Sequence, residues 1–357
     1  MGFSHFYGIG PLKYKLLKER FGSAKQAYQA TTKSMEEVIG PQLADRFDKF
    51  RKTVNLQRKY EEIRKKDIFV LTVDDTAYPR KLKEISDPPI CLYIKGDIRT
   101  IDLSKDMFFG VVGTRKPTTY GQLITHTFST ELSEEGLVIV SGMALGVDTI
   151  AHRSALEAGG KTIAILGCGV DIVYPHSNLE LYKRIIAGGG LIISEFPPGL
   201  TVQKGLFIAR NRIISGLSMG VLVAEGTKES GALITARYAA EQGREVFAPP
   251  VPLTSLMSEA PNILIKQGAK FVTTVEDILG EFQIKKGMMN KKMMQDISPD
   301  EAQIVEILSR EPKSADELAF DTKKTISALS YILSTLEIKN MIEKDEEGKY
   351  RIISMGK

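Results

Sequence analysis

Residues that could bind phosphate and stack on bases are concentrated in one short segment near the middle of the chain. The segment reads KGLFIARNRIISGLS over residues 204–218. Guanidinium groups stay charged and bind phosphate oxygens through paired hydrogen bonds, and aromatic rings stack on bases of any sequence. The candidate side chains for binding unpaired nucleic acid are Lys204, Phe207, Arg210, Asn211 and Arg212.

A structural role is the alternative for the same residues. Phe207 would then lie in the core, and the arginines would form internal ion pairs with Glu195 or Glu225. Bulk charge does not decide between the two, because a formal net charge of +4 is small for 357 residues. A surface that attracts a polyanion must therefore come from local arrangement.

Further candidates lie in the turns that follow apolar segments. Backbone N–H groups at glycine turns and helix N-termini favour negative charge, although tight connections explain such glycines equally well. The candidate phosphate-binding residues of these turns are Arg115, Ser141, Gly142, His176, Asn178, Ser230 and Gly231.

The elements that must position these residues alternate between strands and helices from about residue 67. Continuous apolar runs such as FFGVV, LVIVS and LIIS are typical of parallel strands covered on both faces. The helices expected between such runs span about 121–136, 147–158, 179–187 and 231–243, and another contains the 204–218 segment. We therefore predict an α/β fold, with an extended Rossmann-like, doubly wound parallel sheet over residues 67–282 and ligands beyond the carboxyl ends of its strands.

Two smaller domains are expected on either side of this sheet. Residues 1–66 read as short helices, with Gly10-Pro11 starting one helix and Gly22 ending it. The Lys- and Met-rich stretch 283–297 is predicted to be a linker.

Residues 298–357 are predicted to form a winged helix of three helices and a hairpin, with 322–335 in the recognition-helix position. Lys323 and Lys324 could meet phosphates there. The acidic hairpin tip, Asp345, Glu346 and Glu347, argues against DNA, so a protein-contact or regulatory module is an equal alternative.

Composition places the chain among globular proteins of a reducing compartment. Hydrophobic residues make up 43% and charged residues 26%. Cys91 and Cys168 lack metal-ligand spacing and suggest buried free thiols. No signal pattern or bilayer-spanning apolar run is visible. We expect a cytoplasmic protein without cofactor or metal.

A search for enzymatic motifs leaves one rival interpretation. The G-x-G-x-x-G fingerprint and P-loop spacing are absent from the strand-to-helix turns, and the four histidines do not cluster with metal spacing. His152 is expected to be a packed or capping residue. The rival is a nucleotide-processing hydrolase of the lysine-decarboxylase-like Rossmann group, because Glu225-Gly226-Thr227 faintly resembles part of its glycine loop.

A series of ordered motifs resembles one family along nearly the whole chain. The sequence is similar to the bacterial DNA-processing protein A (DprA/Smf) family of natural transformation. The motifs that carry this resemblance are YPRKLKEISDPPICLYIKGD, VVGTRKPTTYG, VSGMALGVDTIAHRSAL, TIAILGCGVDIVYPHSN, LIISEFPPG, RNRIISGLS, SGALITARYAAEQGREVFA and NILIKQGA.

The resemblance implies a non-enzymatic, sequence-tolerant binder of single-stranded DNA. It implies a homodimer that protects incoming DNA and helps load the RecA recombinase, with an N-terminal helical domain of the SAM or helix-hairpin-helix kind and a C-terminal winged helix. By matching position, Arg115 would bind phosphate, Lys204 and Phe207 would be the lysine and the base-stacking ring, and 210–212 would be the RNR core of the groove.

The chain departs from the family pattern at several positions. Ile208 stands where proline is usual, and His176 stands where a lysine or arginine often follows Tyr-Pro, which makes phosphate contact there weaker and pH-dependent. Pro250-Val251 replaces the usual Pro-Gly, and the 258–262 loop lacks its usual glycine. A glycine-dependent turn of the family is therefore altered in this chain.

Overall fold

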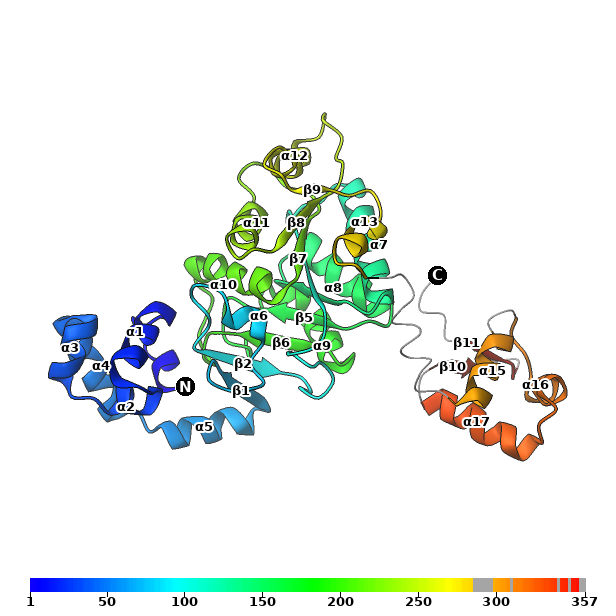
Figure 1. Ribbon diagram of the computed structural model, residues 1–357, viewed down its shortest axis with the longest axis horizontal. Coiled ribbons are helices and arrows are strands. Elements are labelled where there is room, and N and C mark those ends of the chain that lie inside the picture. The colour runs from blue at the N-terminus through cyan, green and yellow to red at the C-terminus, as the bar shows by residue number, and fades with distance from the viewer. Residues whose placement is uncertain (285–297, 309–310, 339–340, 346–347, 353–357) are drawn as a thin grey trace. The chain divides into compact units, whose positions relative to one another are not determined.

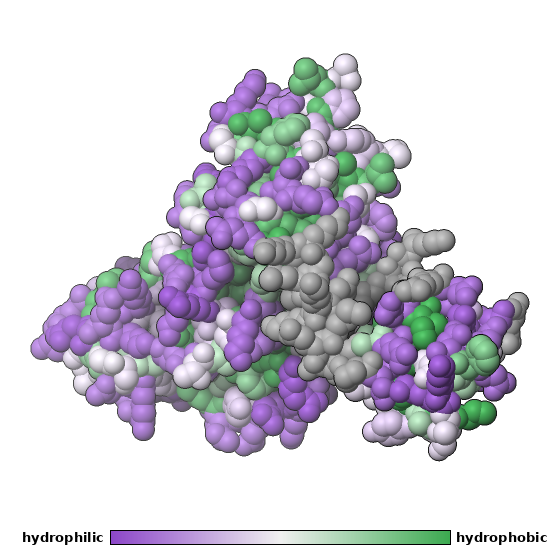
Figure 2. All heavy atoms as spheres, turned by 45° about the vertical axis from the view of Figure 1, so that its right-hand side comes forward, coloured by the Kyte–Doolittle hydropathy of each residue, from purple (hydrophilic) through white to green (hydrophobic). Residues whose placement is uncertain are grey.

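The computed structural model describes residues 1–284, 298–308, 311–338, 341–345 and 348–352. It divides into two compact units, Met1–Ile278 and Leu279–Lys357. Hydrophilic residues cover most of the face shown in Figure 2, and hydrophobic residues appear there in small groups. Most of the expected linker 283–297 lies outside the described residues.

A mixed sheet forms the centre of the first unit (Figure 1). Its strand order is β1-β2-β6-β5-β4-β3-β7-β8-β9. The strands are β1 (Ile68–Thr72), β2 (Cys91–Lys95), β3 (Phe108–Val112), β4 (Val138–Ser141), β5 (Thr162–Ile165), β6 (Leu191–Ser194), β7 (Gly220–Val223), β8 (Glu245–Ala248) and β9 (Lys270–Phe271). Every residue of β3 through β7 is buried, as their apolar sequences predict for strands covered on both faces.

The Rossmann-like prediction is confirmed, but the sheet is not parallel throughout. The seven neighbouring strands β6-β5-β4-β3-β7-β8-β9 pair in parallel. Strand β2 pairs in antiparallel orientation with β1 on one side and with β6 on the other. A continuous apolar run shows that both faces are buried and carries no information about strand direction. The segment between β1 and β2 holds only the short helix α6 (Arg80–Lys83).

Helices connect the parallel strands where the sequence predicts them. The predicted ones are α7 (Thr119–Glu134), α8 (Val147–Glu157), α9 (Leu179–Ala187), α10 (Lys204–Leu217) and α11 (Gly231–Glu241). Two further helices were not predicted, namely α12 (Glu259–Lys266), between β8 and β9, and α13 (Val275–Glu281), after β9. Helix α7 begins two residues earlier than expected, because the Thr118 side chain caps it by accepting a hydrogen bond from Gly121 N at 3.2 Å.

The strand order creates a switch point between β3 and β7. From β3 the chain passes through α7 to β4 on one side, whereas α10 returns the chain to β7 on the other side. Loops after these two strands therefore diverge and leave a crevice at their carboxyl ends. Figure 1 shows helices on both faces of this sheet.

Short helices precede the sheet in the same unit. They are α1 (Pro11–Phe21), α2 (Ala24–Gln29), α3 (Thr32–Ile39), α4 (Pro41–Thr53) and α5 (Leu56–Lys65). Gly10 and Gly22 flank α1 as predicted. The Ser4 hydroxyl lies 2.7 Å from the Tyr93 hydroxyl of β2, which ties this region to the sheet. The boundary expected at residue 66 lies within one compact unit and stays a prediction.

From residue 298 on, the described part of the second unit has the predicted three helices and hairpin. Its elements are α15 (Pro299–Leu308), α16 (Ala315–Thr322), α17 (Ile326–Ile338), β10 (Ile342–Lys344) and β11 (Tyr350–Ile352). Helix α17 starts four residues later than expected, because the left-handed Lys323 (φ 53°) ends α16. Lys324 is ion-paired with Asp300 at 2.7 Å. Glu346 and Glu347 lie outside the described residues.

Candidate nucleic-acid interface

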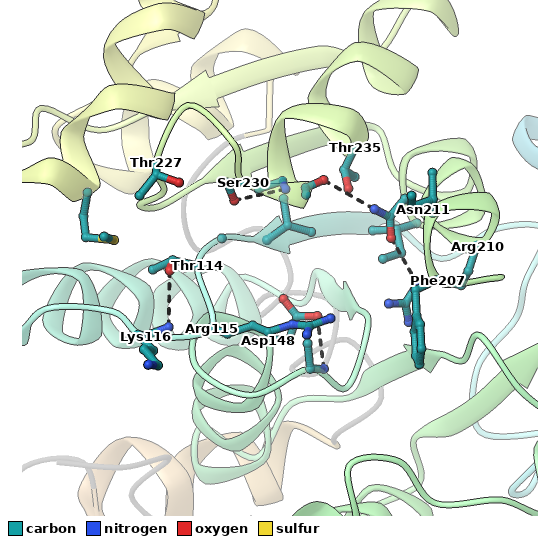
Figure 3. A pocket seen from close by; sticks show the side chains of 18 residues that line it. Thr114, Arg115, Lys116, Asp148, Phe207, Arg210, Asn211, Thr227, Ser230 and Thr235 are labelled. Carbon is teal, nitrogen blue, oxygen red and sulfur yellow. Dashed lines mark hydrogen bonds between the residues drawn. The ribbon is translucent and has the colours of Figure 1, made fainter. Parts of the chain in front are cut away.

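A pocket of about 430 Å³ opens at the switch point (Figure 3). We call it the switch-point pocket. Its walls come from the loop after β3, the start of α8, the exposed face of α10 and the start of α11. Figure 3 shows Arg115 and Lys116 on one side, Ser230 and Thr235 opposite them, and Phe207 and Arg210 at one end. Predicted site residues from three distant parts of the sequence thus converge: Arg115, the segment of Phe207, Arg210 and Asn211, and the pair Ser230 and Gly231.

Arg115 is exposed at the pocket wall on a loop with fixed ends. Thr114 N donates to the Glu225 carbonyl at 2.8 Å, and Thr118 N donates to the Glu225 carboxylate at 2.8 Å. Within the described residues, neither an ion pair nor a hydrogen bond engages the guanidinium of Arg115. The loop is therefore held in place while its cation remains free for a ligand.

Arg210 is a buried cation beneath the same pocket. Its Nη1 donates to the carbonyls of Gly142, at 2.7 Å, and Ile165. Burial lowers the pKa of this guanidinium to about 10, and the negative charge of Asp148 opposes that shift. The Asp148 carboxylate itself accepts hydrogen bonds from Gly142 N and Ala144 N. The positive charge of Arg210 is thus held by carbonyl dipoles and favours an anion in the pocket.

Phe207 is half-buried between the ring of Tyr174 and the backbone at Gly167. Its ring centroid lies 5.4 Å from that of Tyr174, with 39° between the ring planes. A Cβ at Gly167 would lie 2.9 Å from the Phe207 ring, so glycine allows the ring to rest on the loop after β5. The exposed part of the ring borders the pocket, where a base could stack.

The start of α11 forms the opposite wall. Ser230 caps the helix by accepting a hydrogen bond from Ala232 N at 3.2 Å. Asn211 Nδ2 donates to the Gly231 carbonyl at 3.4 Å, which joins α10 to this helix. The helix N-terminus adds a partial positive charge to that of Arg115, Lys116 and Arg210.

The structure does not bring Arg212 to the switch-point pocket. Its guanidinium is buried, donates to both Glu195 oxygens at 2.6 and 2.8 Å, and donates to Asp87 at 2.8 Å. The structural alternative considered above, an ion pair with Glu195, therefore holds for this arginine. In the part of the chain that the structure describes, Glu225 pairs with no arginine and instead accepts hydrogen bonds from the N–H and the hydroxyl of Thr118.

Three predicted phosphate ligands are engaged inside the protein. The Ser141 hydroxyl donates to the Val111 carbonyl at 2.7 Å, and Asn178 Nδ2 donates to Met143 O at 3.0 Å. Gly142 N is used by Asp148, and a Cβ at Gly142 would lie 2.6 Å from the Arg210 guanidinium carbon. These hydrogen bonds shape the loop after β4, and phosphate contact at the three positions stays a prediction.

Lys204 and His176 are exposed but do not line the pocket. Lys204 starts α10 one turn before Phe207. Sequence reasoning missed Lys116, Leu145 and Tyr174, which border this pocket or a smaller one that adjoins it. The sequence signal for two of them was adjacency, since Lys116 follows Arg115 and Tyr174 precedes His176 by two positions.

His152, which the sequence analysis expects to be a packed or capping residue, is engaged inside the protein. His152 is buried, as expected of a packed residue, and burial lowers its pKa to about 3. Its Nδ1 lies 2.7 Å from the Thr162 hydroxyl.

Over the described ranges, His, Cys, Asp and Glu side chains form no group of three suited to a metal. None of the helices found there could cross a bilayer.

Comparison with known proteins gives two family matches. Residues 69–283 match the DNA recombination-mediator protein A family, and residues 294–348 match the DprA winged helix domain. Protein Smf from Synechocystis is 34% identical and covers 98% of this chain, which covers 97% of that protein.

Two solved structures are also similar. DNA processing protein A from Streptococcus pneumoniae is 36% identical with a TM-score of 0.69, over 77% of this chain and 94% of that chain. DNA processing protein A from Helicobacter pylori, from a study of its single-stranded DNA binding mode, is 34% identical with a TM-score of 0.54, over 60% of this chain and 95% of that chain. The resemblance seen in the motifs is confirmed, and the chain belongs to the DNA recombination-mediator protein A (DprA/Smf) family.

Proposed function

We propose that this protein binds single-stranded DNA in the switch-point pocket. The proposal rests on the three side chains that border this pocket: the free cation of Arg115, the buried cation of Arg210 and the half-exposed ring of Phe207. Phosphates would bind Arg115, Lys116 and the start of α11, while a base stacks on Phe207. The Helicobacter pylori relative, which comes from a study of single-stranded DNA binding, supports the same ligand.

In cells, the protein would act as a recombination mediator during natural transformation. It would protect incoming strands and help load the RecA recombinase, as a homodimer. The family description and the match to relatives along almost the whole chain support this role. Both cysteines are buried free thiols, which supports the reducing cytoplasm as its place of action.

The mediator would work without catalysis. Asp148, which lines the pocket, and Glu225 are buried acids, and their carboxylates accept hydrogen bonds from Gly142, Ala144 and Thr118. Both carboxylates hold the loops of the pocket in position through these hydrogen bonds, which is a role expected of acids in a binding site. This arrangement and the family match favour binding over the rival hydrolase function.

A competition experiment tests the proposal. Fluorescence anisotropy of a labelled single strand should show displacement by unlabelled single strands and weaker displacement by duplex of equal length. Chromatography of nucleoside monophosphates incubated with the protein should show no release of free base. Equal displacement by duplex would overturn the assignment of the pocket, and base release would establish the hydrolase instead.

A further inference from the structure

The helices that precede the sheet carry a strong excess of positive charge. Residues 1–66 contain 15 lysines and arginines but only seven aspartates and glutamates, which gives them a net charge of +8. The whole chain carries +4, so all the other residues together carry −4. Charge that is concentrated in one part of a chain points to a polyanionic ligand. The function proposed above uses none of these cations.

Nearly half of the cations in residues 1–66 have no acidic partner. Eight of the 15 form ion pairs with carboxylates. Within the described residues no carboxylate pairs with the other seven, and all seven are exposed. Four of them form two groups whose surroundings the structure defines, Arg64 with Lys65 and Lys13 with Arg46.

Polar contacts fix residues 1–66 to the sheet. The Ser4 hydroxyl lies 2.7 Å from the Tyr93 hydroxyl of β2, and the Tyr14 hydroxyl donates to Asp74, just after β1, at 3.2 Å. These helices and the sheet belong to one compact unit. The exposed cations of the helices therefore keep a set position relative to the switch-point pocket.

The end of α5 lies beside the loop that borders the pocket. Lys66, which follows α5, is ion-paired with Asp171 at 2.8 Å. Asp171 precedes Tyr174 by three residues, so their Cα atoms are at most about 11 Å apart, and Tyr174 borders the smaller adjoining pocket. The exposed Arg64 and Lys65 in the last turn of α5 are therefore close to the place where a strand would leave the switch-point pocket.

The second group lies at the turn 8–10, which leads into α1. Arg46 of α4 lies over the ring of Phe6, with its Cζ 5.8 Å from the ring centroid, and Lys13 is in the first turn of α1. Gly10 gives α1 no side-chain cap, so the first N–H groups of the helix add partial positive charge to that of the two side chains.

The turn 8–10 also lies near the loop of Asp171. The turn lines a pocket of about 370 Å³ together with Pro197 and Leu200, which follow β6. Between these two residues, Gly199 N donates to the Asp171 carboxylate at 2.8 Å. The loop of Asp171 thus connects the switch-point pocket to both groups of free cations.

We infer that residues 1–66 form a second contact surface for DNA, on which free cations bind phosphates of the single strand after it leaves the switch-point pocket. This inference rests on the proposed binding of single-stranded DNA. A strand held in the pocket brings its following phosphates to these cations, which favours DNA over an anionic membrane as the ligand. The surface adds affinity that increases with strand length and decreases with salt.

Two lengths of oligothymidylate separate this surface from the pocket. Anisotropy titrations over a range of salt use strands of about 4 and about 16 nucleotides, the limits of typical single-strand site sizes. Arg64→Gln combined with Lys65→Gln should weaken binding of the longer strand and reduce the magnitude of its log-log salt slope by about 1.4, or about 0.7 for each lost contact. Lys13→Gln combined with Arg46→Gln should have the same effect. Binding of the shorter strand should not change in either variant.

A matched control removes two charges elsewhere. Lys105→Gln combined with Arg153→Gln changes two exposed cations outside residues 1–66 and should keep the affinity and the slope for both strands. An unchanged slope for the longer strand in both test variants would overturn the inference, as would an equal loss for the two lengths.

Two further ligands test the choice of a single strand. Duplex DNA and vesicles of anionic phospholipid are titrated with the same proteins. Loss of duplex or vesicle binding in the test variants, with the longer strand still bound normally, would overturn the inference and assign the surface to that ligand. Failure of the proposed function is distinguishable, because the unaltered protein would then show no preference for a single strand over duplex of equal length.

Discussion

At the scale of single residues, Arg212 stabilises the fold and does not bind the ligand. Its ion pairs with Glu195 and Asp87 join α10 to the segments around β6 and before β2. Arg212→Ala leaves the Glu195 carboxylate, whose side chain is only 11% exposed, without its cation. We predict that unfolding becomes easier by about 3–5 kcal/mol, measured by urea denaturation. A variant of normal stability that loses only DNA affinity would contradict this role.

His152 should make the stability pH-dependent. Its pKa is about 3 in the folded protein, because burial disfavours the charged ring, and about 6.5 when unfolded. Between these two pKa values, the unfolded chain binds one proton more than the folded protein. The free energy of unfolding is therefore highest above pH 6.5 and falls by about 1.4 kcal/mol for each pH unit below it.

His152→Gln should remove this component of the pH slope. Urea denaturation at about pH 6.5 and pH 5 measures the slope in both proteins. Buried Asp148 also titrates abnormally but is present in both proteins, so its contribution cancels in the comparison. His176→Gln, at an exposed position, is the matched control and should keep the slope of the unaltered protein. An identical slope in His152→Gln would contradict the prediction.

The residue types of the site could be predicted from the sequence, but their directions could not. Arg210 and Arg212 are two positions apart on α10, which places them about 200° apart around a helix. Both could not face the same pocket. The spacing alone thus predicts that one arginine is turned away, whereas only the positions of Gly142, Ile165 and Glu195 show which one.

At the scale of elements, Gly146 fixes the loops that carry the site. Its φ of 77° is unfavourable for any residue with a side chain, and a Cβ would overlap the backbone of Thr114 and Arg115. Gly146→Ala should cost more than about 1 kcal/mol of stability and should weaken single-strand binding, because the Arg115 loop must move.

Gly280→Ala on α13 is the matched control for that substitution. A Cβ there meets nothing within 4 Å, and alanine favours a helix by about 0.5–1 kcal/mol over glycine. Thermal unfolding and anisotropy measure both variants. Unchanged stability and affinity in Gly146→Ala would show that the loop tolerates a side chain and that its backbone does not position Arg115.

Local signals predicted the elements well where capping or burial defines them. Gly10-Pro11 and Gly22 mark the ends of α1, and the predicted helix 179–187 is α9. The antiparallel edge formed by β1 and β2 could not be predicted in this way. Pairing direction depends on which strand lies next to which, and that is decided by tertiary packing.

At the scale of the whole molecule, the site exists because the sheet has a switch point. Arg115 follows β3, Phe207 and Arg210 lie on α10, and Ser230 starts α11. The rule that ligands bind beyond the carboxyl ends of strands predicts the correct edge. It cannot predict strand order, so it does not tell which loops flank the crevice. Nor does it tell which polar groups of those loops, like the Ser141 hydroxyl, are engaged in internal hydrogen bonds.

The second unit is expected to be dispensable for holding the strand. It has its own buried core, formed by residues such as Ile304, Leu318 and Leu333, and the exposed positions of α17 include Ile326 and Tyr331 rather than cations. Deleting residues 283–357 should leave the single-strand affinity and its salt dependence close to those of the full chain in anisotropy titrations. Loss of binding on deletion would assign the DNA contact to the winged helix.

The central claim is that Arg115 contacts a strand phosphate in the switch-point pocket. The most direct measurement is the slope of log affinity against log salt concentration for a single-stranded oligonucleotide. Arg115→Ala should reduce the magnitude of this slope by about 0.7, the contribution of one phosphate contact, and should weaken binding at low salt. Arg99→Ala, an arginine whose side chain is 87% exposed and which does not line the pocket, should keep the original slope. An unchanged slope in Arg115→Ala would contradict the account.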